Sequence, residues 1–337
     1  ARSFLLDDTI LPSGLTREEE RQACRALKGS MLRQEVYADD ANHPGATPDQ
    51  IARALRPYSI TEQNFTIRQL QPRGANLHAI FFTHAREAIS HYYERSPSDP
   101  RIQHALTLEV DDYGNILKQA AIAYGRDVSA FSTQWDRDRQ TTPLLTYTEN
   151  RVTNAVEAVD VHRAPLSCES VTFELTGYTP TGAAGRFQAA DFVEPDPGLA
   201  GRLRHKFADQ VAFEAAVTSN SCRRPLEWLR TLYRRDDLTS LLPLGDMQPL
   251  ALSGEAYKLA FTAGLLANTF QRPRPGQLAE ALLHDPAAVL GGQTGNQGGY
   301  CEGKAQKVDG LFPASDPDDF WWLPSGRSFY STNLSDS

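Results

Sequence analysis

Cysteine is scarce in this sequence, with four residues in 337: Cys24, Cys168, Cys222 and Cys301. No two of them have the two-residue spacing of a zinc knuckle or a redox-active dithiol, and four are too few for a disulfide scaffold. We therefore expect buried free thiols. A bridge between Cys222 and Cys301 stays open as an alternative, although no pattern in the sequence supports it.

Long apolar runs and a surplus of basic residues are also missing. The longest apolar stretches, such as Leu241 to Leu244, are far shorter than a membrane-spanning helix requires. The formal net charge is -8, whereas a nucleic-acid-binding surface needs a basic face that displaces counterions from phosphates. We expect no nucleic-acid partner and no membrane contact by this chain.

The organisation of the chain favours a mainly β fold. Residues 1–57 are predicted to form a helix-containing N-terminal part, and residues 58–337 are mostly predicted strands and loops. The regular strand–helix alternation of a parallel α/β sheet is missing, as are fixed-period repeats and linkers. We expect long antiparallel hairpins in one curved sheet, a few short helices, and a single segment over residues 1–337. Because the chain begins Ala1-Arg2-Ser3, without an initiator Met or a signal peptide, we expect a fragment of a longer polypeptide.

Helix signals are local and short. Thr16 and Glu19 form a predicted capping box before a helix that ends near Gly29. A second helix is predicted after Thr47, with Pro48 in its first turn. Further helical stretches are predicted over residues 187–192 and over residues 277–283, the latter closed by the sequence Asp-Pro at 285–286.

Strand signals occupy most of the remaining chain. The clearest is a hairpin that joins residues 106–110 to residues 116–124 through a turn at 111–115, where Gly114 permits a positive φ. Two more hairpins are predicted, over residues 225–244 with a turn at Asp236-Asp237, and over residues 319–330 with a turn at 324–326. Single strands are predicted over residues 31–37, 59–68, 79–83, 89–93, 144–153 and 170–175.

A metal site is the first chemistry to consider. His84, Glu87 and His91 would share one face of a helix and could then hold a metal ion. The flanking residues favour an extended backbone, in which His84 and His91 point to opposite faces. We therefore predict no metal site and no cofactor.

Catalytic patterns are missing too. The glycine-rich stretch from Gly291 to Gly299 lacks the Lys and Ser/Thr that end a P-loop, and we expect a surface loop there. No serine stands in a Gly-x-Ser-x-Gly elbow, and the adjacent aspartate pairs suit turns better than acid–base catalysis. We predict no catalytic residue and therefore no enzyme. The aromatic pair Trp321-Trp322 has two interpretations, a core or interface anchor and, as the alternative function, the platform of a carbohydrate-binding surface module.

Several stretches resemble one protein family. RALKGSMLRQEVY (residues 25–37), YSITEQNFTI (58–67) and LTLEVDDYGN (106–115) are similar to the middle and C-terminal region of TcdB-like proteins, the B components of insecticidal Tc toxin complexes. GEAYKLAF (254–261) and DFWWLPSGR (319–327) resemble the same family. The sequence DDYGN before an apolar strand also looks like a degenerate Rhs/YD-repeat unit.

The resemblance implies a structural role. In that family the B and C components form a hollow Rhs-type β-shell that encloses a cytotoxic cargo domain. The expected partners are the C component with its cargo domain and other parts of the same B chain, and the expected location is extracellular, as a secreted virulence factor. The chain lacks propeller blades and the self-cleavage residues of the C component, so the resemblance carries neither docking to the A component nor protease activity.

Overall fold

A large antiparallel sheet dominates the computed structural model of the chain, which describes residues 5–96, 98–127, 131–207, 209–216, 221–276, 278–291 and 298–331. Eleven strands form this sheet in the order β1-β2-β3-β4-β5-β6-β9-β12-β13-β17-β16, and three small two-stranded sheets accompany it. The predicted fold class, mainly β with a large antiparallel sheet and a few short helices, is confirmed.

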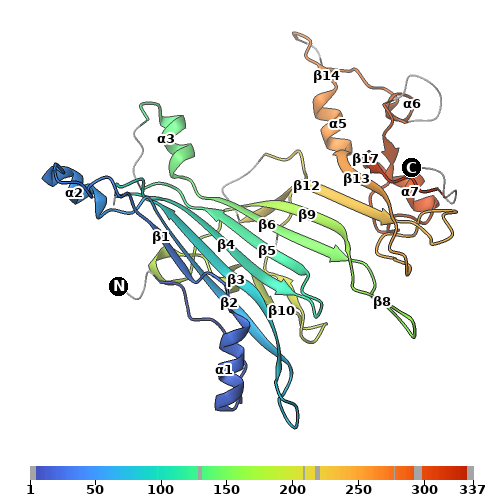
Figure 1. Cartoon of the computed structure of the whole chain (residues 1–337). Coiled ribbons are helices and arrows are strands. Elements are labelled where there is room, and N and C mark those ends of the chain that lie inside the picture. Colours follow the sequence, from blue (N-terminus) through green and yellow to red (C-terminus); the bar gives the residue numbers. More distant parts are fainter. Residues whose placement is uncertain are drawn as a thin grey trace. The chain divides into compact units, whose positions relative to one another are not determined.

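Figure 1 labels the elements, which have the following bounds. The strands are β1 (Arg33–Val36), β2 (Ser59–Gln71), β3 (Ile80–Tyr92), β4 (Arg101–Val110), β5 (Ile116–Ala123), β6 (Leu144–Val152), β7 (Val156–Ala158), β8 (Val161–Arg163), β9 (Ser167–Thr176), β10 (Val193–Pro195), β11 (Leu203–His205), β12 (Cys222–Tyr233), β13 (Ser253–Phe261), β14 (Gln271–Arg272), β15 (Glu280–Ala281), β16 (Cys301–Glu302) and β17 (Trp321–Arg327). The helices are α1 (Arg17–Ala26), α2 (Pro48–Ala54), α3 (Gln134–Thr141), α4 (Ala189–Phe192), α5 (Ala263–Thr269), α6 (Pro286–Leu290) and α7 (Gly303–Val308).

The chain divides into two compact units. Unit 1 comprises Ala1–Glu109, Gln119–Thr146 and Tyr178–Lys206, and unit 2 comprises Val110–Lys118, Tyr147–Gly177 and Phe207–Ser337. None of the boundaries between the units coincides with the predicted change of character near residue 58. The single segment over residues 1–337 stays a prediction.

Both predicted helix starts in the N-terminal part are confirmed. The side chains of Thr16 and Thr47 each accept a hydrogen bond from the backbone N–H three residues on. In return, the side chains of Glu19 and Gln50 accept the backbone N–H of the cap residue. These reciprocal bonds satisfy amides that the first helical turn leaves without a partner. Glu19 also accepts from the Gln69 side chain at 3.0 Å and from the Arg73 N–H at 2.9 Å. One carboxylate therefore joins α1 to the end of β2.

The predicted strands over residues 79–83 and 89–93 form one strand, β3, which pairs with β2 along its whole length. The strand β3 stays continuous across this stretch because a β-bulge takes up one extra residue. Asn64 lies opposite Glu87 and Phe65 lies opposite Ala85, so Arg86 is an extra residue in β3. Similar shifts interrupt the pairing of β12 with β9 and of β13 with β17. Each bulge increases the local twist of the strands.

The hairpin of β4 and β5 is confirmed with its turn. The Asp111 carboxylate accepts the N–H of Tyr113 at 2.9 Å and the N–H of Asn115 at 2.8 Å, and Gly114 has φ of 94°. An aspartate that accepts the N–H two residues on is typical of an Asx turn. The acidic pair at 111–112 thus begins a turn, as predicted.

The second predicted hairpin is wrong in its second arm. The next strand in the chain to pair with β12 is β13, and the two strands are joined by a long connection in which only Arg234 and Leu241 form an isolated bridge. Leu242, Leu244 and Met247 in this connection are buried in the core of unit 2. The apolar run therefore reflects burial and not a strand, and Pro243 has no N–H to give to a ladder.

Two C-terminal predictions are also wrong. The helix predicted over residues 277–283 is replaced in its described part by the strand β15, and Asp285-Pro286 begins a helix, α6, with the Asp285 carboxylate accepting the Ala288 N–H at 3.1 Å. Proline suits the first helical turn, since its missing N–H needs no partner there. The predicted turn at residues 324–326 lies inside β17, which pairs with β13 and β16.

The strands at the two ends of the sheet are short. All four residues of β1 are exposed. At the other end β16 pairs only with Trp321 and Trp322, so residues 323–327 of β17 have β13 on one side and no described strand on the other. Unpaired strand edges are the places where a further strand can add. Among the described helices none is long and apolar enough to cross a membrane.

Candidate functional site

The three residues considered for a metal lie on β3 and take separate partners. His84 Nδ1 lies 3.0 Å from the Ala85 carbonyl oxygen, and His91 stacks on Tyr93 with ring centroids 5.9 Å apart. Glu87 contacts neither histidine and instead meets His104 of β4. Across the described ranges, no group of three or more His, Cys, Asp and Glu side chains could hold a metal ion.

Glu87 belongs to a buried polar cluster that the sequence reasoning missed. His104 Nε2 donates to Glu87 Oε1 at 2.8 Å, and the Tyr124 hydroxyl lies 3.0 Å from His104 Nδ1. Asn64 Nδ2 donates to the second Glu87 oxygen at 3.2 Å. The Tyr124 hydroxyl accepts the Phe187 N–H at 2.9 Å.

Burial and charge act in opposite directions in this cluster. Burial raises the pKa of the Glu87 carboxyl, but the hydrogen bond and charge of His104 and the bond from Asn64 outweigh it, so the pKa lies below its ordinary value. Burial raises the pKa of Tyr124 to about 12. His104 is 2% exposed, and a general base must reach its substrate's proton. We interpret the cluster as a structural hydrogen-bond network that links β2, β3 and β4.

The tryptophan pair is buried. Trp322 is 0% exposed and Trp321 is 4% exposed, so neither ring offers a flat face to a sugar. The carbohydrate-platform alternative is therefore wrong, and the anchor interpretation describes both rings. Trp322 packs edge-on against Trp228 and Phe312, with ring centroids 5.6 and 5.1 Å apart.

A second charged cluster lies among these rings. Arg230 of β12 donates from Nε to Glu169 at 2.7 Å and from another nitrogen to Asp316. Its guanidinium lies 4.5–4.9 Å from the centroids of three rings, those of Trp228, Phe312 and Trp322.

Glu169 in this cluster is supported from three sides. It also accepts from Trp228 Nε1 at 2.8 Å and from Arg151 at 2.9 Å. Burial raises the pKa of Glu169, but the Arg230 charge and these hydrogen bonds outweigh it and hold the pKa below its ordinary value. The sequence contains a signal for this cluster. The alternate positions of the strand on either side of Arg230 are apolar, so the Arg230 charge requires buried partners.

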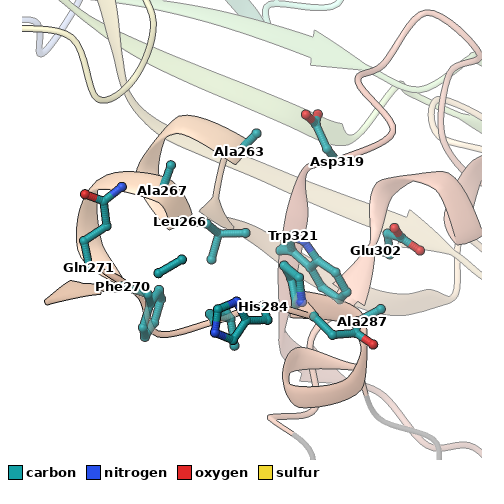
Figure 2. Close-up of a pocket in the computed structure, with 14 residues that line it drawn as sticks. Ala263, Leu266, Ala267, Phe270, Gln271, His284, Ala287, Glu302, Asp319 and Trp321 are labelled. Carbon is teal, nitrogen blue, oxygen red and sulfur yellow. The ribbon is translucent and has the colours of Figure 1, made fainter. Parts of the chain in front are cut away.

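A pocket of about 460 Å³ lies in unit 2, and Figure 2 shows the side chains that line it. Leu266, Phe270 and Trp321 line one part of it, and His284, Glu302 and Asp319 contribute polar groups. No described hydrogen bond joins these polar groups, so the pocket presents no assembled acid–base pair. The glycine-rich stretch predicted as a loop has residues 292–297 outside the described ranges.

Comparison with known proteins connects this fold to a family. Residues 22–163 match the family described as "Insecticide toxin TcdB middle/C-terminal region". The resemblance to TcdB-like proteins is therefore confirmed. No curated protein matches this chain.

Solved structures share the fold of this chain. A crystal structure described as TcdB2-TccC3 has a TM-score of 0.62 at 20% sequence identity, over 97% of this chain and 14% of that one. The Tc holotoxin pore of Photorhabdus luminescens has a TM-score of 0.53 at 21% identity, over 82% and 13%. TcdB2-TccC3 without its hypervariable C-terminal region has a TM-score of 0.50 at 20% identity, over 81% and 13%. The chain therefore spans about one seventh of the first of these chains.

Proposed function

We propose that this chain is a wall segment of the β-shell that a B component and a C component of a Tc toxin complex build around a cytotoxic cargo domain. The observation that carries the proposal is the eleven-stranded antiparallel sheet. The structural likeness to a TcdB2-TccC3 chain covers 97% of this chain but only 14% of that one. A wall of strands is a part of such an assembly and needs neighbours on both sides.

The two ends of the sheet support this role. A four-residue strand and a two-residue strand stand at its edges, and the outer side of β17 beyond Trp322 has no described strand. Other parts of the same B chain would supply the next strands and cover these edges. The wall would then continue without an exposed ladder.

Partners follow from the proteins that share the fold. These are described as pairs of TcdB2 with TccC3, one of them without a hypervariable C-terminal region. By analogy, the partners here are a C component and the variable cargo domain at its C-terminal end, and the assembly is secreted. The role is structural and not enzymatic, since both buried charged clusters are engaged in joining strands.

Protease protection of the cargo tests the proposal. The complete protein is assembled with a C component and the complex is isolated by size-exclusion chromatography. We expect co-elution and a cargo domain that resists a protease added outside. A variant with a weakened wall, Arg230→Met, should lose part of this protection, whereas Lys258→Met, which alters an exposed ion pair on the neighbouring strand, should keep it. Failure to co-elute, or equal digestion of cargo with and without the protein, would contradict the proposal.

A further inference from the structure

One face of the sheet in unit 1 carries a block of uncharged residues that ends at Arg101 of β4. Residues directly opposite in an antiparallel pair point to the same side. Thr61 lies opposite Ser90, Gln63 opposite Ala88, and on the next strand Gln103 and Ala105 lie opposite Ser90 and Ala88. These six residues, all small or uncharged, occupy three neighbouring strands, β2, β3 and β4 (Figure 1). We call this surface the uncharged face.

The uncharged face extends over two more strands and forms a shallow trough. Ala121 and Ala123 of β5 and Thr146 of β6 line a pocket of about 470 Å³ together with the residues of β3 and β4. Ala105, Ala121 and Ala123 are exposed. Small side chains leave this trough open, and the residues that line it are uncharged apart from His104, which is 2% exposed.

The opposite face of the same strands is already covered by the chain itself. It carries Glu87, His104 and Asn64, whose partners include the Tyr124 hydroxyl and, through it, Phe187. Phe187 and Phe192 are each 1% exposed and pack against each other with ring centroids 5.5 Å apart. The segment that holds them, Tyr178–Lys206, therefore lies over this face.

The outer side of the covering segment has the polarity of a surface that meets water. Arg204 donates to Glu194 at 2.8 Å across β10 and β11, and both side chains are well exposed. Charged residues on exposed positions are the rule for strands that face solvent. The uncharged face departs from that rule although 23% of the residues in the chain are charged.

We infer that the uncharged face is turned to the interior of the shell and contacts the cargo domain, while the segment Tyr178–Lys206 lies on the outside. This inference rests on the proposed function. Partner selection depends largely on repulsion between like charges and on charges left unpaired. A wall without fixed charge rejects neither acidic nor basic stretches, which suits a cargo whose sequence varies from one C component to another. The occupant of the trough is thus the cargo and not a second copy of this chain.

Two matched alanines allow the orientation to be tested. Ala105 is exposed on the uncharged face, and Ala190 is exposed on the covering segment in α4. Ala105→Cys and Ala190→Cys are made singly in the complete protein. Each is treated with a PEG-maleimide too large to enter a closed shell, before and after assembly with a C component, and modification at each position is quantified by peptide mass spectrometry. Both thiols should react before assembly.

After assembly we expect labelling at position 105 to slow by about tenfold or more, because the reagent then needs a local opening of the wall, while labelling at position 190 stays unchanged. Provided that a complex forms, three results would overturn the inference. These are protection at position 190 with reaction at position 105, equal protection of both positions, and no reaction at position 105 before assembly. Failure of the complex to form, or unprotected cargo inside it, would instead overturn the proposed function. A photo-crosslinking residue placed at 105 should further attach the cargo domain, and attachment only from position 190 would refute the orientation.

Discussion

Arg230→Met removes the cation from the most enclosed charged cluster of unit 2. The Arg230 side chain is 1% exposed, and its partners Glu169 and Asp316 are 7% and 10% exposed. Methionine fills similar space but leaves two carboxylates in the core with less compensation. Breaking a buried ion pair from one side costs roughly 3–5 kcal/mol of unfolding free energy, and lost contacts with three aromatic rings act in the same direction. We therefore expect a loss of about 3–5 kcal/mol.

The assay is urea unfolding followed by tryptophan fluorescence, because Trp228 and Trp322 lie within the cluster. The control is Lys258→Met, whose ammonium pairs with Glu227 at 2.5 Å while both side chains are more than 40% exposed. Exposed pairs contribute below about 1 kcal/mol. The control should thus unfold close to the parent midpoint.

A double variant separates the ion pair from simple packing. Glu169→Gln removes one of the uncompensated charges, so in combination with Arg230→Met the loss should fall short of the sum of the single losses by roughly 0.5–3 kcal/mol. Strict additivity, or a loss below about 1 kcal/mol for Arg230→Met alone, would refute the reasoning. Either result would mean that water or movement of neighbouring groups compensates the carboxylates.

Three further outcomes follow from single groups. Hydrogen bonds, first that from the Arg73 N–H, lower the pKa of the Glu19 carboxyl from 4.5 to about 2. The stabilising contribution of Glu19 is therefore complete above pH 4.5 and is lost as the pH falls toward 2. An NMR titration of Glu19 should show the lowered pKa, and thermal unfolding of Glu19→Gln should lack this acid-dependent part of the stability, whereas Glu20→Gln should match the parent. Burial raises the pKa of Cys168 to about 11, so iodoacetamide at pH 8 should modify exposed Cys24 and spare Cys168 in native protein, and equal alkylation by mass spectrometry would contradict this. Gly125→Ala would place a Cβ 1.8 Å from the backbone oxygen at the end of α3, and we expect a loss of roughly 1–3 kcal/mol by chemical denaturation, with an unchanged midpoint counting against the close approach.

The sequence predicted best those elements whose cause is local. Both capping boxes and the Asp111 turn were found because each depends on residues within about four positions, whose side chains bond to the nearby backbone. The long strand β3 was seen only as two pieces, since the extra residue at its bulge interrupts the alternation of apolar and polar side chains.

Elements set by distant contacts were misread. Leu242 and Leu244 are apolar because a loop enters the core of unit 2, a fact that no local pattern distinguishes from a strand. Asp285-Pro286 is consistent with either end of a helix until its neighbours are known. The buried partners of Arg230 and His104 come from strands and loops far along the chain, so their clusters required the fold.

The bulges in this sheet determine which side of the sheet the side chains that follow them face. Between two bulges, successive residues of a strand alternate strictly between the two sides. Arg86 changes that alternation once in β3, so Glu87 shares a side with Asn64 of β2, whereas Ala85, two residues earlier, shares the other side with Phe65. This interruption of the ladder therefore decides which side chains of β3 lie on each side of the sheet.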